Sequence, residues 1–246
     1  MLKIPIIILL LVLPILYVNQ SIAEHSNNEI FTVGVPSHGS SIVYVYVEGL
    51  AEVYKKLGYT LEIRSAPARR VVLEANRGTI DGVMLSPTII ENHAFNLLRI
   101  NVPMATADMM AISLSTKSDI KSIEDLKQYR VGYVLGYATT GSMLHNLNAE
   151  PIPSMNLLFS MIAKGRLDVA LVLRREAYRY VDKHPRFSHL KMHETPMLSV
   201  VLYHHLNVKH QSIKDRVESI MADYWASGKV QQQVELLTPR SPFTPH

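Results

Sequence analysis

Two arginines at the starts of predicted helices are the residues best suited to bind a ligand. Arg70 opens a predicted helix that ends before Gly78. Arg174 directly follows a buried apolar run that ends at Leu173. Because a guanidinium presents a planar fork of N–H donors that fits a carboxylate, both arginines indicate a small ligand with a carboxylate group. The alternative is that they are surface residues of helices, where most arginines lie.

Two polar loops add further candidate ligand groups. Ser37 and His38 follow an apolar, β-branched run, and Thr139 and Thr140 follow a second apolar run and precede a predicted helix. Ligands of α/β proteins bind at the carboxyl ends of parallel strands, and the free N–H groups of a helix N-terminus favour an anion. Tyr137 in the second loop is a candidate for stacking, with core packing as its alternative. A simple turn is the alternative for the first loop.

Other chemistries are not indicated. The sequence has eleven histidines, but His184, His189 and His193 do not share one regular face because Pro185 separates the first two. We therefore expect solvated histidines and no metal site. The sequence contains no nucleophile elbow, phosphate loop, dinucleotide fingerprint or pair of catalytic carboxylates. These patterns predict neither an enzyme nor a cofactor.

Alternating strands and helices would position the candidate groups. Strands are expected at 30–36, 59–65, 80–85, 97–100, 109–115, 130–135, around 152, at 167–173, 190–192 and 198–204. Helices are expected at 42–57, 69–77, from 142, at 154–164, 174–184, 212–227 and 229–237. This order predicts an α/β protein with parallel strands. A helix–Gly–x–x–Asp–strand pattern occurs at 78–81 and again at 165–168, which suggests two related halves.

The first 23 residues are expected to be a secretory signal peptide. Lys3 precedes the apolar run Ile4–Val18, and Ser21 and Ala23 are the small residues that a signal peptidase recognises. The run is shorter than the roughly 20 apolar residues of a membrane span, although a membrane anchor is the alternative. Cleavage near Ala23-Glu24 would leave a periplasmic chain without cysteine, long enough to bury a core without disulfides.

The charge of the chain is mild. The formal net charge is +4, and the basic residues form no Lys/Arg block. Nucleic-acid binding usually needs a clustered basic surface, so we expect no nucleic-acid partner.

Several segments together carry a family resemblance: FTVGV at 31–35, the Pro67-x-x-Arg70 step, GTIDGV at 78–83, IEDLKQYRVGYVLGYATT at 123–140 and KGRLDVAL at 164–171. In their order and spacing, the chain resembles the family 3 extracellular solute-binding proteins, which are the periplasmic amino-acid-binding type associated with ABC transporters. The resemblance covers nearly the whole chain after residue 23.

The resemblance implies a two-lobe periplasmic-binding-protein fold of type II with the ligand in a cleft between the lobes. Lobe 1 would comprise residues 24–111 and 200–238, lobe 2 residues 112–199, and residues 239–246 would be a tail. The strands 109–115 and 198–204 would be the hinge, about which the lobes close on the ligand. The closed form of a monomer would then dock on a membrane permease.

The sequence departs from the family at its two charge anchors. Amino-acid binders of this family place an Arg after a Thr-containing loop, to pair with the ligand carboxylate, and an Asp at the end of the second-lobe strand, to hold the α-amino group. Here the loop is 86–93 and has no Arg, and the Asp position is Leu173. Because burying an unpaired ammonium is costly, we expect a small polar solute that bears a carboxylate rather than an ordinary α-amino acid.

The resemblance also places Ser86, Thr88 and Met104 at the cleft, although core or hinge packing is the alternative for Met104. The candidate ligand-binding residues are Ser37, His38, Arg70, Ser86, Thr88, Met104, Tyr137, Thr139, Thr140 and Arg174. The first functional hypothesis is a binding protein that feeds a transporter. The second is a sensory protein of the same fold that signals through a membrane kinase or cyclase. An enzyme of this fold, such as a dehydratase, is a third and weaker hypothesis.

Overall fold

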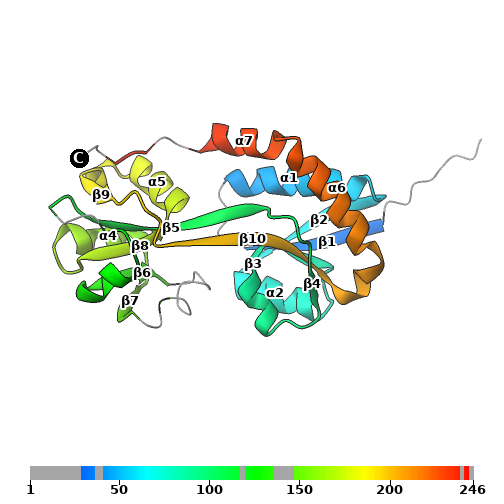
Figure 1. The fold of residues 1–246 in the computed structure, drawn as a ribbon, viewed down its shortest axis with the longest axis horizontal. Coiled ribbons are helices and arrows are strands. Elements are labelled where there is room, and N and C mark those ends of the chain that lie inside the picture. The colour runs from blue at the N-terminus through cyan, green and yellow to red at the C-terminus, as the bar shows by residue number, and fades with distance from the viewer. Residues whose placement is uncertain are drawn as a thin grey trace, which may run out of the picture.

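The computed structural model describes residues 29–36, 41–116, 120–135, 144, 147–238 and 241–243. Two α/β lobes lie side by side and are joined by the long strands β5 (Ala105–Leu114) and β10 (Leu198–Asn207) (Figure 1). The strands form one continuous sheet in the order β2-β1-β3-β10-β5-β8-β6-β7, while β4 pairs with β10 and β9 with β5. The predicted fold class is confirmed.

Lobe 1 is built on the parallel pairs β1–β2 and β1–β3. Its strands are β1 (Glu29–Pro36), β2 (Tyr59–Ala66), β3 (Gly82–Pro87) and β4 (Leu97–Arg99). Its helices are α1 (Ser41–Lys55), α2 (Ala68–Asn76), α6 (Lys214–Ala226) and α7 (Lys229–Leu237), with 3-10 turns η1 (Thr88–Asn92) and η4 (Val208–Ile213). Helices α1, α6 and α7 cover one face of the sheet and α2 covers the other (Figure 1).

Lobe 2 repeats this plan with the parallel pairs β6–β7 and β6–β8. Its elements are β6 (Val131–Val134), β7 (Ala149–Ile152), β8 (Val169–Leu173), β9 (Leu190–Met192), α4 (Met155–Ala163) and α5 (Arg174–Lys183), with 3-10 turns η2 (Glu124–Gln128) and η3 (Pro185–Phe187). Helices α4 and α5 pack on one face of the sheet.

Helix α1 resolves an ambiguity in the sequence, since residues 42–47 also alternate like a strand. The buried side chains are Ile42, Val45, Tyr46, Leu50, Val53 and Tyr54. Their spacing of three and four residues places them on one helical face, and this face packs into the lobe 1 core.

The Gly–x–x–Asp pattern has the same structural role in both lobes. Asp81 Oδ2 accepts a hydrogen bond from the Thr32 amide at 2.7 Å, and Asp168 Oδ2 accepts one from the Arg130 amide at 3.0 Å. In each case the carboxylate joins the turn after a helix to the neighbouring parallel strand. The preceding glycine has a positive φ in both turns, which suits the end of a helix. The repeat is therefore a structural feature of the two lobes.

The crossing strands are longer than the sequence indicated. β5 begins at Ala105, not at residue 109, and β10 extends to Asn207, not to residue 204. Residues 105–108 are held by antiparallel pairing with β10. Pairing between backbones does not require apolar side chains, and the apolar run in the sequence begins only at Met109. The sequence therefore predicts the strand only from that residue.

Two expected elements fall wholly or largely outside the described residues, namely the signal peptide at 1–23 and the helix expected from residue 142. Within the described part of the chain, no helix has both the length and the apolar character needed to cross a membrane. The limits proposed for the two lobes stay a prediction.

Candidate functional site

Strand direction places the candidate site between the lobes. β10 runs from lobe 2 into lobe 1 and is antiparallel to β3, so Pro87 at the carboxyl end of β3 pairs with Leu202, toward lobe 2. β5 runs the opposite way and is antiparallel to β8, so Leu173 at the carboxyl end of β8 pairs with Met109, toward lobe 1. The carboxyl ends of the parallel strands in each lobe thus point toward the other lobe. This is where α/β proteins bind ligands.

On the lobe 1 side, β3 reaches this region through a distorted segment. Met84 and Leu85 of β3 lie opposite the single residue His204 of β10, so the register shifts by one residue. Among the described residues, Leu85 is the only non-glycine residue with a positive φ, at 54°. A bulge of this kind re-aims the residues that follow it. Here those residues are Ser86, which is buried, and Thr88, which is exposed.

Two buried histidines support this segment from β10. His204 Nδ1 donates to the Val83 carbonyl at 3.1 Å, and its Nε2 accepts from the Tyr54 hydroxyl at 2.7 Å. Burial lowers the pKa of His204 to about 3, so the ring is neutral. His205 Nε2 contacts Glu91 Oε1 at 3.2 Å, and burial lowers the pKa of His205 as well.

The expectation of solvated histidines is wrong for these two residues and for His193, which is also buried and bonded to the Ser113 hydroxyl and the Ile120 amide. Among the described residues, no group of three or more side chains of the metal-binding types could hold a metal ion. These histidines have structural roles in the cores of the lobes.

Arg70 is committed to a contact within lobe 1. Its Nε lies 2.8 Å from Glu74 Oε1, and the other carboxylate oxygen lies 3.3 Å from Arg64 Nε. The hydrogen bonds from Arg70 and Arg64 hold the pKa of Glu74 below its usual value. The Arg70 side chain is 64% exposed. This geometry matches the alternative that Arg70 is a surface residue of its helix.

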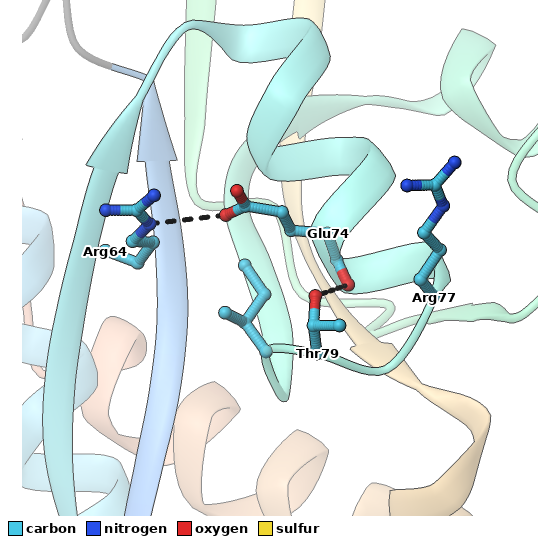
Figure 2. Close-up of a pocket in the computed structure, with 5 residues that line it drawn as sticks. Arg64, Glu74, Arg77 and Thr79 are labelled. Atoms are coloured by element: carbon cyan, nitrogen blue, oxygen red, sulfur yellow. Dashed lines mark hydrogen bonds and ion pairs between the residues drawn. The ribbon is translucent and has the colours of Figure 1, made fainter.

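A shallow hollow of about 370 Å³ lies beside this cluster, lined by Arg64, Glu74, Arg77, Thr79 and Ile80 (Figure 2). It is built from β2, α2 and the turn before β3, and all its lining residues belong to lobe 1. The Thr79 hydroxyl donates to the Glu74 backbone carbonyl at 2.9 Å, which links the turn before β3 to α2. Arg77, Thr79 and Ile80 precede the amino end of β3, so this part of the hollow lies toward the edge of the sheet opposite to the one that faces lobe 2.

Arg174 lies where the lobes meet. Its Nε is 3.4 Å from Asp108 Oδ2, and the Ser199 hydroxyl donates to Asp108 Oδ1 at 2.7 Å. Asp108 belongs to the crossing strand β5 and Ser199 to β10, while Arg174 begins α5. Both side chains of the ion pair are about one third exposed, at 32% and 29%. The ion pair is therefore partly open to solvent.

Asp108 and Ser199 are site candidates that sequence reasoning missed. They join Arg174 only through pairing between strands that are distant in the chain, and an isolated Asp in a polar stretch carries no signal of that pairing. The structure thus adds a negative charge next to a predicted positive one.

Met104 is buried in the core of lobe 1, 3% exposed, and its carbonyl accepts a hydrogen bond from the Trp225 indole at 3.3 Å. Its environment matches the core-packing alternative. Ser37, His38, Tyr137, Thr139 and Thr140 lie outside the described residues. The other four candidates, Arg70, Ser86, Thr88 and Arg174, lie at or just after carboxyl ends of strands that face between the lobes.

Comparisons with known proteins identify the fold. No protein-family profile matches the sequence, and no curated protein matches it. Solved structures do match. The ligand-binding core of GluR0 in complex with L-glutamate has a TM-score of 0.69 at 14% identity, over 87% of this chain and 100% of that one.

Two further matches have the same character. The probable amino-acid ABC transporter extracellular-binding protein YtmK from Bacillus subtilis has a TM-score of 0.67 at 16% identity, over 86% of this chain and 98% of that one. An ancestral arginine-binding protein bound to arginine has a TM-score of 0.64 at 16% identity, over 86% and 99%. At this identity the similarity establishes a shared two-lobe fold.

Proposed function

We propose that this chain is a divergent family 3 extracellular solute-binding protein of the periplasm. It binds a small polar solute between its lobes and delivers it to an ABC-type permease. The observation that carries the proposal is the arrangement of strands. The carboxyl ends of β3 and β8 are directed toward the opposite lobe across two crossing strands. The similarity to solved amino-acid-binding proteins supports the same function.

Arg174 and Asp108 suggest which charges the solute carries. Arg174 suits a carboxylate, and Asp108 beside it suits an ammonium or another hydrogen-bond donor. A solute with both groups could exchange partners with this ion pair and leave no buried charge unpaired, which an acid alone could not do. Asp108 thus offers a replacement for the family's missing acidic anchor. Three solved structures of this fold hold L-glutamate, arginine and glutamine.

Binding would close the lobes by rotation about β5 and β10. Asp108 and Ser199 lie on these two strands, so a solute held by Asp108 would contact the hinge itself. The closed monomer would then present both lobes to the permease. Binding without turnover is part of this proposal.

A sensory role is the second candidate, in which the closed form is passed to a membrane kinase or cyclase. One comparison favours it: the matched GluR0 structure is described as a ligand-binding core, whereas YtmK is described as a transporter's binding protein. Both roles need the same closure. Co-purification from detergent-solubilised membranes, with a permease or with a sensor protein, separates them.

A thermal-shift screen tests the solute class. We expect a carboxylate-bearing solute among amino acids and dicarboxylates to raise the melting temperature. We expect Asp108→Asn to reduce the rise in melting temperature caused by amino acids more than the rise caused by dicarboxylates. If only solutes without a free carboxylate raise the melting temperature, the assignment of Arg174 to a carboxylate is wrong. Because Arg70 is already paired with Glu74, Arg70→Ala should change the affinity less than about two-fold, well below the effect of losing a charged hydrogen bond.

A further inference from the structure

The last described residues, 241–243, contact lobe 2, although the helix before them, α7, belongs to lobe 1. Phe243 is 7% exposed and belongs to the lobe 2 core, together with Phe159 and Val181. Its ring centroid lies 6.1 Å from that of Tyr178 on α5. Figure 1 shows residues 241–243 as a short red segment beside α5. The segment 239–246, expected to be a tail, therefore contains a buried anchor.

The preceding helix belongs firmly to lobe 1. Val230 and Val234 of α7 are buried in the lobe 1 core. The end of α7 is fixed as well. The Thr238 hydroxyl donates to the Val234 carbonyl at 2.7 Å, and the Thr238 amide donates to the Glu235 backbone carbonyl at 3.1 Å. The chain thus leaves lobe 1 from a defined point.

The connection between these two anchors is short. Phe243 lies five residues after Thr238, and a fully extended chain of that length reaches at most about 18 Å. A rotation of the lobes that moves Thr238 farther than this reach from the position of Phe243 in lobe 2 must extract Phe243 from the lobe 2 core. Beyond β5 and β10, the C-terminal segment is therefore a further covalent link across the lobes.

We propose that Ser241–Phe243 is a strap that restricts rotation of the lobes while Phe243 is docked beside Tyr178. Extraction of Phe243 frees the hinge for a wider range of lobe orientations. An apolar anchor suits this role, since burial of an aromatic ring is favourable and needs no specific partner orientation. The proposal concerns the motion of the lobes and does not depend on which solute binds.

Electron–electron distance measurements between two spin labels test the strap in the full-length protein. The chain has no cysteine, so Glu52→Cys on α1 and Lys183→Cys on α5 give one label on an exposed site of each lobe. We expect a narrow distance distribution for the parent chain and at least a two-fold wider or clearly shifted one for Phe243→Ala. Phe243→Leu, which keeps an apolar anchor, should stay close to the parent.

Leu236→Ala is the matched control, because this apolar residue of α7 is 80% exposed. It should leave the distance distribution unchanged. Removal of residues 241–246, which keeps Thr238 and α7 intact, should reproduce the effect of Phe243→Ala. If Phe243→Ala and this truncation lower the melting temperature but leave the distances as in the parent, Phe243 only fills the lobe 2 core and the strap is disproved.

Discussion

The buried His204 makes the stability of lobe 1 depend on pH in a calculable way. In the unfolded chain the imidazole titrates near its ordinary pKa of 6.5, whereas burial lowers the pKa of folded His204 to about 3. Between these values the unfolded state binds a proton that the folded state does not. The contribution of His204 to stability is therefore fully present above about pH 7 and declines as the pH falls.

The size of the effect follows from this difference. The loss approaches about 1.4 kcal/mol per pH unit below the unfolded pKa. At pH 5.0 the accumulated loss relative to pH 7.5 is about 2 kcal/mol. Urea denaturation at both pH values measures it, because the free energy of unfolding is obtained by linear extrapolation.

Substitution isolates the contribution of this ring. His204→Asn keeps a donor near the Val83 carbonyl but does not titrate, so it should be less stable at pH 7.5 and should lose about 2 kcal/mol less between pH 7.5 and 5.0 than the parent. His93→Asn is the control, since His93 is exposed at the end of η1, and it should keep the parent's pH dependence. The expected difference between the two pH-dependent losses is about 2 kcal/mol. If the losses of the parent and His204→Asn instead agree within about 0.5 kcal/mol, the reasoning is refuted.

Two further substitutions test the segment that carries Ser86. Both Leu85→Gly and Leu98→Gly should lower the free energy of unfolding, but the loss should be about 1 kcal/mol smaller for Leu85→Gly. The reason is that Leu85 has a positive φ, which is unfavourable for leucine and not for glycine. Equal losses in urea denaturation would show that Leu85 is unstrained. Gly82→Ala should be more destabilising than Gly132→Ala, because the added Cβ would lie 2.5 Å from the His205 backbone carbonyl oxygen, whereas at Gly132 it would meet the movable end of Leu167. We expect a loss of about 1–3 kcal/mol for the first, and equal melting temperatures for the two variants would contradict this.

Regular elements could be predicted because their signals are local. The helix that ends at Gly165 was expected from an apolar face, a capping Ser154 and a terminal glycine. In the structure Ser154 Oγ accepts from the Leu157 amide at 3.3 Å, and Gly165 has a positive φ. The buried strand β8 was equally readable from its apolar run. The two-lobe fold followed from the order of these elements.

The site was harder to predict because its contacts connect distant parts of the chain. Asp108 meets Arg174 only because β5 pairs with β8, and it meets Ser199 only because β5 pairs with β10. Neither pairing register is encoded near residue 108. The contact between Arg70 and Glu74 is local, at a spacing of four residues that helix geometry favours, and this signal could have identified Arg70 as paired.

The Phe243 anchor was missed for a related reason. Three prolines in the last residues are typical of an irregular tail, and a single aromatic residue among them carries no periodicity. Its burial depends on the surface that α5 presents, which only the folded lobe 2 creates.

Isothermal titration calorimetry with the solute identified by thermal shift tests the central claim, that the solute binds between the lobes at Arg174. Arg174→Ala should weaken the affinity by roughly 10- to 100-fold, as expected for loss of a charged hydrogen bond. Arg179→Ala, which removes a similarly exposed arginine from the same helix, should leave the affinity unchanged. If Arg174→Ala binds the solute as tightly as Arg179→Ala does, the site is not where the account places it.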